Sequence, residues 1–445
     1  MDTFKKHNIY QIPLKEEYGR DDVFLLYAPV AGNMMIASTA ECNHLKYILE
    51  HPADASADEA EIIESLIVGT PSNYRDSKVS KVEDFLRMYV LPNYVCNFAC
   101  SYCFSAKGRS KKVMNKEHLK AALDFFIDNQ RIKTDRLAIT YLGGGEPTIS
   151  WELLKFGFKY ADHKARQQNI VMMTTVVTNG SVINQEMVDT FREYNVRPRI
   201  SFEILEEIQN KQRGQYHNVC RGIDLLCQGG VSTMVRSMIT PANVELMPQM
   251  IQHLHDRFPR IKSVLFDPII SNETFSDIDF TRHFYDLYYN SFLEARQLAA
   301  IYGINLECTP LRNLDMVVER FCTGEFCLTP EGTITLCHQV SSPQELRYED
   351  HIYAKFEDGS LKIDRDKFSR LIKQNTMYSQ PRCQDCFIKW NCGGGCMMQS
   401  NQYSDNILAV ICDFTRRFSK HLLLERLSNS YATDGDSLED TIKSY

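Results

Sequence analysis

Two patterns of apolar residues divide the chain. Near the N-terminus, the short apolar runs Val23–Tyr27 and Met34–Ala37 flank a Pro-Val-Ala-Gly turn, which predicts a β-hairpin. Helical spacing of apolar positions follows over residues 40–49 and 57–68. From about residue 84, apolar strand patterns alternate with amphipathic helical patterns. Such alternation is typical of a parallel sheet covered by helices.

The alternating region predicts an α/β fold with about six strand–helix units over residues 84–305. The expected strands are Arg87–Leu91, Leu137–Leu142, Ile170–Val177, Arg199–Ile204, Thr233–Ile239 and Ser263–Pro268. The clearest helical patterns between them cover His118–Asn129, Gln185–Tyr194, Val219–Leu226 and Met247–Phe258. Six units indicate an incomplete barrel, whose active site would lie at the carboxyl ends of the strands.

Composition excludes several classes of protein. A net charge of −7 over 445 residues gives no reason to expect nucleic acid as a partner. The N-terminal residues have no apolar core of a signal peptide, and no apolar run is long enough to span a membrane. We therefore expect a cytoplasmic protein. In a reducing compartment, its fifteen cysteines are better interpreted as metal or cluster ligands than as disulfides.

The clearest chemical motif is the spacing C-x3-C-x2-C formed by Cys96, Cys100 and Cys103. Iron–sulfur clusters normally take four thiolates. Three thiolates in one loop would leave one iron of a [4Fe–4S] cluster open to a substrate or cofactor, which is a catalytic arrangement. The alternative is a zinc knuckle, which requires a closed set of four ligands.

The sequence CNFACSYCF, followed about forty residues later by GGGEP (residues 143–147), resembles the radical S-adenosylmethionine (SAM) enzymes. The resemblance implies that the open iron chelates the amino and carboxylate groups of SAM. It further implies that SAM is cleaved to a 5'-deoxyadenosyl radical, which abstracts hydrogen from a substrate. In such enzymes the cofactor carries the chemistry, and the protein supplies binding and orientation.

The same resemblance assigns residues to SAM binding. Gly144, Gly145 and Glu146 would contact the methionyl amine, and Tyr102 would stack near the adenine. Asn179 is either an ordinary turn residue or a residue that lines the same cleft. The remaining candidates are Ser201, at the position where the family often has Ser-Leu-Asp-Gly, and Arg213, which could pair with the SAM carboxylate or lie on the surface. Here Ser201 is followed by Phe-Glu-Ile, so the family's Asp-Gly is absent.

A second set of cysteines lies in the C-terminal third. Its spacings closely resemble the SPASM extension of radical SAM enzymes that modify peptides and proteins. The resemblance implies two auxiliary [4Fe–4S] clusters. Two zinc sites are the alternative, because sets of four thiolates also bind zinc. The first cluster would be held by Cys322, Cys327, Cys337 and Cys396, and the second by Cys383, Cys386, Cys392 and Cys412. If Cys327 is not a ligand, the first cluster has an open iron for a substrate thiolate.

These expectations define the domains and the function. We expect a winged-helix-like unit at residues 1–80, the barrel at 84–305, the SPASM domain at 306–425 and a tail at 426–445. The first unit is either a cap or a recognition element that binds a leader peptide by strand addition. The leading hypothesis is a maturase that forms a thioether from a Cys of a ribosomally made precursor peptide, with flavodoxin or ferredoxin as electron donor. The alternatives are a formylglycine-generating anaerobic sulfatase maturase, a carbon–carbon crosslinking enzyme and a zinc-binding scaffold.

Overall fold

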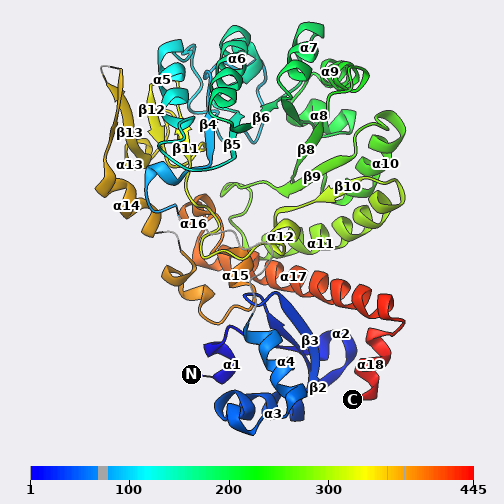
Figure 1. Cartoon of the computed structure of the whole chain (residues 1–445). Coiled ribbons are helices and arrows are strands. Elements are labelled where there is room, and N and C mark those ends of the chain that lie inside the picture. Colours follow the sequence, from blue (N-terminus) through cyan, green and yellow to red (C-terminus); the bar gives the residue numbers. More distant parts are fainter. Residues whose placement is uncertain (1, 69–78, 358, 375) are drawn as a thin grey trace. The chain divides into compact units, whose positions relative to one another are not determined.

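The structure is a computed structural model, and it describes residues 2–68, 79–357, 359–374 and 376–445 (Figure 1). The chain forms two compact units, each built from separate stretches of sequence. Unit 1 comprises Met1–Ser77, Thr309–Cys322 and Asn375–Tyr445, and unit 2 comprises Lys78–Cys308 and Thr323–Gln374. The expected end of the N-terminal domain near residue 80 adjoins residues 69–78, which lie outside the described residues.

Unit 2 is organised around one eleven-stranded sheet with the order β10-β9-β8-β7-β6-β5-β4-β11-β12-β13-β14. Strands β4 to β10 are parallel to their neighbours, and β11 is parallel to β4. The parallel strands are β4 (Arg87–Val90), β5 (Arg136–Tyr141), β6 (Val171–Thr178), β7 (Arg197–Ser201), β8 (Met234–Ile239), β9 (Ser263–Pro268), β10 (Asn305–Glu307) and β11 (Phe326–Leu328). Antiparallel strands β12 (Thr333–Thr335), β13 (Ile352–Glu357) and β14 (Ser360–Ile363) follow.

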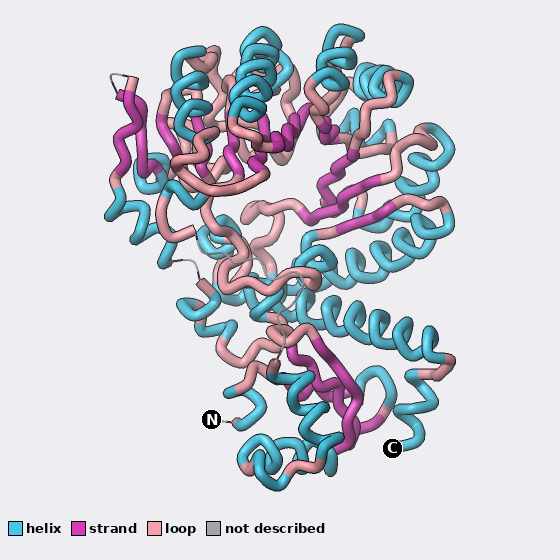
Figure 2. The backbone as a smooth tube through the Cα atoms, viewed as in Figure 1, coloured by secondary structure: helices cyan, strands magenta, loops and turns pink. Residues whose placement is uncertain are grey.

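The helices of unit 2 lie along the outside of this sheet (Figure 2). They are α5 (Lys116–Phe126), α6 (Trp151–Gln167), α7 (Gln185–Glu193), α8 (Glu206–Gln212), α9 (Tyr216–Gln228), α10 (Met247–Arg257), α11 (Ile278–Ile301), α13 (Tyr348–His351) and α14 (Arg365–Lys373). The predicted α/β fold with a parallel sheet is confirmed, and a strand lies at each of the six expected places, although β7 ends at Ser201 and not at Ile204. Strand β10 is a seventh, and its three residues are too few to carry a recognisable pattern.

Unit 1 contains a three-stranded antiparallel sheet, β1 (Tyr10–Leu14), β2 (Arg20–Ala28) and β3 (Asn33–Ser38), with β2 in the centre. The predicted hairpin is β2–β3, and strand β1 was not predicted. Its helices are α1 (Thr3–Lys6), α2 (Lys15–Tyr18), α3 (Thr39–Glu50), α4 (Ala57–Ile67), α12 (Thr309–Asn313), α15 (Lys389–Cys392), α16 (Met397–Gln402), α17 (Asp405–Asp434) and α18 (Leu438–Ser444). Ser38 and Ser56 begin α3 and α4 with capping boxes, which explains where these two helices start.

Contacts between distant parts of the sequence hold unit 1 together. The buried hydroxyl of Tyr27 donates to Asn391 Oδ1 at 2.9 Å, and the indole N–H of Trp390 donates to Asn8 Oδ1 at 3.1 Å. Buried polar groups require such partners. The N-terminal sheet and the cysteine-rich C-terminal segment therefore belong to one compact unit.

No helix among residues 2–68, 79–357, 359–374 and 376–445 is long and apolar enough to cross a membrane.

Packing between α9 and the loop after β6 is tight at Gly222. A Cβ atom there would lie 2.1 Å from the backbone oxygen of Gly180. We expect Gly222→Ala to lower the free energy of unfolding by about 1–2 kcal/mol, because the steric cost exceeds the roughly 1 kcal/mol gained in helix propensity. Urea unfolding measures this loss. His217→Ala, on the exposed side of the same helix, should change stability by less than about 0.5 kcal/mol, and equal losses in both variants would contradict the packing argument.

Candidate active site

The loops that follow β4, β5, β6 and β7 bring the expected catalytic residues to one end of the parallel sheet. Cys96, Cys100 and Cys103 lie in the loop after β4, and all three are partly buried. Burial raises the pKa of the Cys96 and Cys100 thiols, and each thiol is close enough to Cys103 for electrostatic repulsion to add to that rise. The three thiols therefore share one site, as the spacing predicts.

The thiols are not arranged around a single ion. Within the part of the chain that the structure describes, no three His, Cys, Asp or Glu side chains form a group that could hold a metal ion.

The glycine loop after β5 packs directly against the backbone that leads into the cysteine loop. A Cβ atom on Gly145 would lie 2.0 Å from the Val95 carbonyl oxygen, and Gly144 has a φ of +87°. Only glycine fits the close approach at Gly145, and glycine adopts the left-handed backbone at Gly144 without a steric cost. The Gly145 and Glu146 N–H groups donate to the carbonyls of Asn93 and Val95 at 3.0 and 2.7 Å. The glycines therefore hold the two loops together.

The carboxylate of Glu146 is buried and accepts four hydrogen bonds from the protein. One oxygen accepts from the Thr148 N–H, the Thr148 hydroxyl and the Thr178 hydroxyl at 3.1, 2.6 and 2.5 Å. The other accepts from the Asn179 N–H at 2.7 Å. This side chain links the ends of β5 and β6, and buried carboxylates require donors of this kind.

Asn179, at the end of β6, faces the cysteine loop. Its amide donates to Asn97 Oδ1 at 2.9 Å, and Asn97 donates in return to Ser181 Oγ at 2.9 Å. Asn97 and Ser181 were not among the expected site residues. Their role became visible only when the fold placed residues more than 80 positions apart beside each other.

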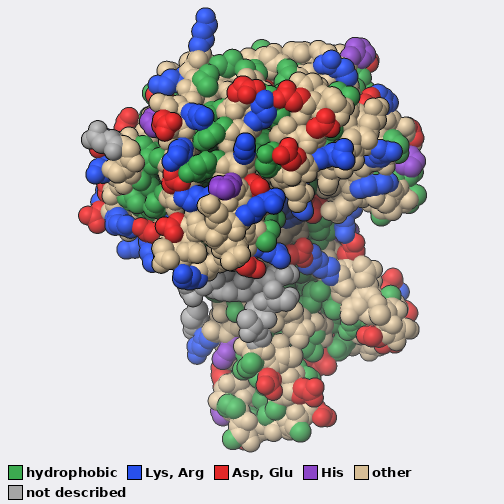
Figure 3. Space-filling model, turned by 45° about the horizontal axis from the view of Figure 1, so that its top comes forward, with side chains coloured by type: hydrophobic (Ala, Val, Ile, Leu, Met, Phe, Trp, Pro, Cys, Tyr) green, Lys and Arg blue, Asp and Glu red, His purple; other side chains and the backbone are tan. Residues whose placement is uncertain are grey.

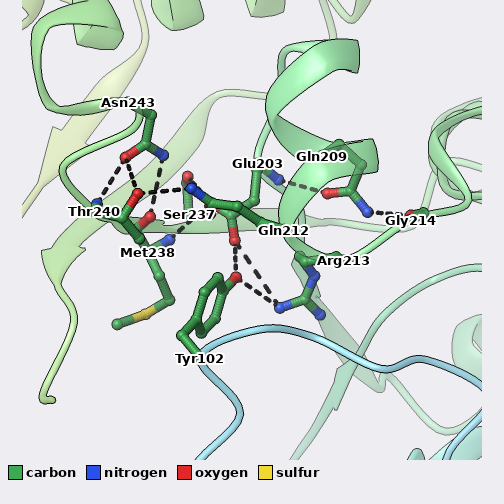
Figure 4. A network of polar contacts seen from close by, with 10 residues as sticks. All are labelled: Tyr102, Glu203, Gln209, Gln212, Arg213, Gly214, Ser237, Met238, Thr240 and Asn243. Carbon is green, nitrogen blue, oxygen red and sulfur yellow. Dashed lines mark hydrogen bonds and ion pairs between the residues drawn. The ribbon is translucent and has the colours of Figure 1, made fainter. Parts of the chain in front are cut away.

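A second buried carboxylate, Glu203, follows β7 and anchors the cysteine loop (Figure 4). It accepts hydrogen bonds from the hydroxyl of Tyr102 and the hydroxyl of Ser237, and from the Met238 N–H at 3.1 Å. Arg213 donates to the Tyr102 oxygen at 3.0 Å and lies 4.0 Å from Glu203. Tyr102 and Arg213, expected near SAM, are therefore joined to each other through Glu203.

Burial controls the protonation of this group. Complete burial raises the pKa of the Glu203 carboxyl, although Arg213 and the hydroxyl donors oppose the rise. Burial also acts against the charge of Arg213, but Tyr102, Cys100 and Glu203 together raise the pKa of its guanidinium above the ordinary value. The guanidinium therefore remains charged beside the cysteine loop, and it opposes the rise that burial causes in the pKa of Cys100.

The backbone after Glu203 keeps the shape that the family sequence would produce. Ile204, at the place of the family's glycine, has a φ of +67° and is fully buried. A β-branched residue rarely adopts this conformation, which glycine adopts without cost. Ser201 is the last residue of β7, opposite Arg236 in the register. Glu203 thus lies where the family has its Asp, despite the changed residues around it.

Amide side chains on α8 extend this anchor (Figure 4). Gln209 accepts from the Glu203 N–H at 2.9 Å and donates to the Gly214 carbonyl at 2.8 Å. The Gln212 side chain donates to the Thr240 hydroxyl at 2.6 Å, and the backbone carbonyl of Gln212 accepts from the Ser101 N–H at 2.9 Å. Helix α8 therefore connects the cysteine loop to the ends of β7 and β8.

Arg109 is a further site residue that the sequence did not single out. One guanidinium nitrogen lies 3.3 Å from Cys103 Sγ, and another donates to the Phe98 carbonyl. It interacts electrostatically with all three thiols. A run of cations directly after the last cysteine was the available signal.

The residues present fit SAM and a cluster. Several buried polar atoms around the cysteine loop have no partner within the described chain, namely Asn93 Oδ1, Arg109 Nε, Gln212 Oε1 and Arg213 Nε. Buried groups of this kind call for a polar ligand or water. Together with three thiols and the glycine loop, they provide donors and acceptors for a charged, polar cofactor.

The eight cysteines of the C-terminal third are distributed over both units. Cys383, Cys386, Cys392 and Cys412 all belong to unit 1. Burial raises the pKa of Cys383 to about 11 and of Cys392 to about 12, and the neighbouring thiols of this set add to both increases. Cys383, Cys386 and Cys412 all lie close enough to Cys392 to raise its pKa, so the four side chains share one neighbourhood.

The four remaining cysteines of the C-terminal third are divided between the two units. Cys322 and Cys396 belong to unit 1, whereas Cys327 and Cys337 belong to unit 2. Cys327 is on β11 in a buried apolar cluster with Leu91 and Leu142. Burial raises its pKa well above the ordinary value, with Glu325 and Cys337 adding to the effect.

Residues 90–278 match the model of the radical SAM superfamily. Unit 2 contains a radical SAM domain. The match begins at the end of β4 and includes the three-cysteine loop, the glycine loop and Glu203. A radical SAM domain implies SAM and one [4Fe–4S] cluster as cofactors, and the protein is therefore an enzyme.

Known radical SAM proteins resemble much of the chain. The cysteine-type anaerobic sulfatase-maturating enzyme of Clostridium novyi (strain NT) is 22% identical over 367 residues, which cover 74% of this chain and 92% of that protein. The structure of native anSMEcpe with bound AdoMet and Kp18Cys peptide matches with a TM-score of 0.60 at 15% sequence identity. The match covers 77% of the present chain and 99% of the anSMEcpe chain. Streptococcus suis SuiB bound to precursor peptide SuiA has a TM-score of 0.50 at 13% identity, with coverages of 89% and 98%. At these identities the structural likeness shows the fold.

We expect Tyr102→Phe to loosen the cysteine loop, because the variant loses the hydrogen bonds to Glu203 and from Arg213. In metal-free protein, amide hydrogen exchange of residues 98–103 should become about tenfold faster, equivalent to about 1.4 kcal/mol. Tyr160→Phe is the control, since the Tyr160 hydroxyl donates to Asp124 on α5 at 2.6 Å. Unchanged exchange in Tyr102→Phe, or the same change in the control, would contradict the anchoring role of Glu203.

Proposed function

We propose that this radical SAM enzyme is a peptide maturase that joins a Cys of a ribosomally made precursor peptide to a carbon of the same peptide through a thioether. The three-stranded sheet at the N-terminus carries the proposal. The sulfatase maturase of C. novyi is matched over 92% of its length, yet about a quarter of the present chain lies outside that match. SuiB, which was solved with a precursor peptide, covers 89% of the chain. In the same structural comparison, anSMEcpe with bound AdoMet and Kp18Cys peptide covers 77% of the chain, so SuiB accounts for a larger share of it.

The N-terminal sheet offers a physical basis for binding a leader peptide. Strands β1 and β3 each pair only with β2 among the described residues, so both have an outer edge. An extended peptide can add to such an edge through main-chain hydrogen bonds. Residues 1–68 contain twelve Asp and Glu against five Lys and Arg, so a leader with basic residues would be favoured electrostatically.

The residues of unit 2 would bind and orient the cofactors. When bound, SAM and its cluster supply a primary carbon radical that removes a hydrogen atom from the peptide. Cys96, Cys100 and Cys103 would hold the cluster, and the charged Arg213 would attract the SAM carboxylate. Gly144 and Gly145 would present backbone groups to the amine. Glu146 and Asn179 would keep the glycine loop and the cysteine loop in register through their hydrogen bonds.

Two auxiliary clusters complete the proposal. The first would use Cys322, Cys327, Cys337 and Cys396, and the second Cys383, Cys386, Cys392 and Cys412. The mutual electrostatic effects of the second four thiols support that ligand set. The burial of Cys327 in an apolar cluster disfavours its thiolate, which supports a weaker role for Cys327 as a cluster ligand.

A sulfatase maturase is the second candidate. The curated relatives favour it, because cysteine-type and serine-type sulfatase-maturating enzymes each match 74% of the chain. The two candidates differ in product. Thioether formation removes two hydrogens and consumes a thiol, whereas formylglycine is an aldehyde.

The test uses reconstituted enzyme, SAM, a chemical reductant and Cys-containing precursor peptides encoded beside the gene. The proposal predicts 5'-deoxyadenosine and a peptide that has lost two hydrogens, that no longer reacts with iodoacetamide and that carries no hydrazide-reactive aldehyde. Removal of the leader should lower turnover at least about tenfold. A bound leader raises the effective concentration of the linked core peptide at the active site, and a peptide without the leader loses this advantage. An aldehyde on a sulfatase-derived peptide, with no product from any precursor, would favour the second candidate and contradict the thioether.

A further inference from the structure

The segment that follows the cysteine loop is strongly basic. Between Cys103 and Glu117 there are five cations, Lys107, Arg109, Lys111, Lys112 and Lys116, and no acidic residue. The chain as a whole has a net charge of −7. On the face displayed in Figure 3, Lys and Arg are interspersed with Asp and Glu, as on most protein surfaces. A run of one sign beside a redox site therefore requires an explanation.

This basic rim, defined as residues 104–113, is held in place by the backbone. The Met114 N–H donates to the Pro92 carbonyl at 2.9 Å, and the Tyr94 N–H donates to the Lys112 carbonyl at 3.0 Å. Gly108 packs directly on Ser342, because a Cβ atom added to Gly108 would lie 2.6 Å from the Ser342 Cβ atom. The segment thus runs back along the residues before the cysteine loop. Fixed cations lose less entropy on binding a partner than cations on a mobile loop.

The cations of the rim are available to a partner. Lys107 and Lys111 are exposed, and neither forms an ion pair with a described residue. Lys112 pairs with Glu331 at 2.8 Å, but 48% of its side chain remains exposed. A further carboxylate near Gly108, that of Glu345, is half-buried and accepts from the Ser341 and Ser342 N–H groups at 2.6 and 3.0 Å. The outward field of the rim is therefore positive.

Two apolar side chains lie among these cations. Phe104 is 48% exposed and Val113 is 49% exposed. Phe104 directly follows Cys103 and lies edge-on to His338, with ring centroids 5.7 Å apart. Exposed aromatic residues surrounded by charges are typical of protein interfaces. The combination resembles a small docking surface more than a solvated loop.

We propose that the basic rim is the docking surface for an acidic one-electron carrier protein. The carrier would lose one electron and the cluster would gain it, with no bond formed or broken. Arg109 connects the surface to the site, because it belongs to the rim and lies 3.3 Å from Cys103 Sγ. A carrier bound at Phe104 would therefore be one residue away from a cluster ligand. Opposite charges would steer the encounter and orient the carrier.

The inference goes beyond the proposed function, because a radical SAM enzyme needs an external electron whatever its substrate. Charge also distinguishes the rim from the N-terminal sheet. The rim favours acidic partners, whereas residues 1–68 carry an excess of acidic side chains. The carrier and a basic leader peptide would thus bind to surfaces of opposite sign.

The test measures binding of purified flavodoxin, an acidic flavoprotein, to the reconstituted full-length enzyme. Lys107→Glu combined with Lys111→Glu should raise Kd about tenfold at low salt, and the difference should shrink to about twofold at 0.5 M salt, where charges are screened. Lys107→Gln with Lys111→Gln should give an intermediate Kd. In stopped-flow experiments, cluster reduction by reduced flavodoxin should slow by a similar factor, while reduction by photoreduced deazaflavin, a small molecule, should not.

The matched control is Lys133→Glu with Lys159→Glu. Both lysines are exposed, Lys133 precedes β5 at the amino end of the sheet, and Lys159 is on α6. The change in net charge is the same, so the control should leave Kd within about twofold. Equal iron content and thermal midpoint would confirm that all variants fold. The inference is overturned if flavodoxin shows no salt-dependent binding, or if the control variant weakens flavodoxin binding as much as the rim variant does. It is also overturned if the rim variant no longer binds the precursor peptide but still binds flavodoxin with the native Kd.

Discussion

The site depends on a buried carboxylate that holds the cysteine loop against the sheet. Glu203 has no exposed surface, and its two oxygens accept from Tyr102 on the cysteine loop and from Ser237 on β8. In a medium of low dielectric constant, a carboxylate without donors would cost several kcal/mol. The need to satisfy Glu203 therefore fixes where Tyr102 lies, and with it the neighbouring thiols. Arg213 supplies the compensating charge and reaches the same hydroxyl.

Glu146 performs the equivalent task on the other side of the site. It joins β5 to β6, as Glu203 joins β7 to β8, and both carboxylates are almost completely inaccessible to solvent. Four consecutive strand ends are thus tied in pairs by side chains that contact backbone N–H groups and hydroxyls. The loops between them can carry thiols, glycines and amides at fixed positions, since the supporting bonds are made within the protein. A rigid second layer of this kind is what placement of a reactive cofactor requires.

Much of this was predictable from the sequence, for local reasons. The six strands, the hairpin β2–β3 and the cysteine loop all follow from short patterns of spacing. The partners of Glu203 did not, because Tyr102 and Ser237 are 101 and 34 residues away and meet only through the fold. The absence of the family's Asp-Gly left no sequence reason to assign a role to Glu203, and the left-handed backbone of Ile204 is visible only in the structure. Likewise, no local pattern indicates that the N-terminal sheet and the cysteine-rich segment share one unit.

The central claim is that three thiols hold a catalytic iron–sulfur cluster that is separate from the C-terminal cysteines. The most direct test counts iron and sulfide per chain after anaerobic reconstitution, in the native protein and in the variant with Cys96, Cys100 and Cys103 changed to Ala. The account predicts about twelve irons in the native protein and about eight in the variant, with sulfide falling in parallel. Zinc in place of iron, or an iron content that the three substitutions leave unchanged, would contradict it.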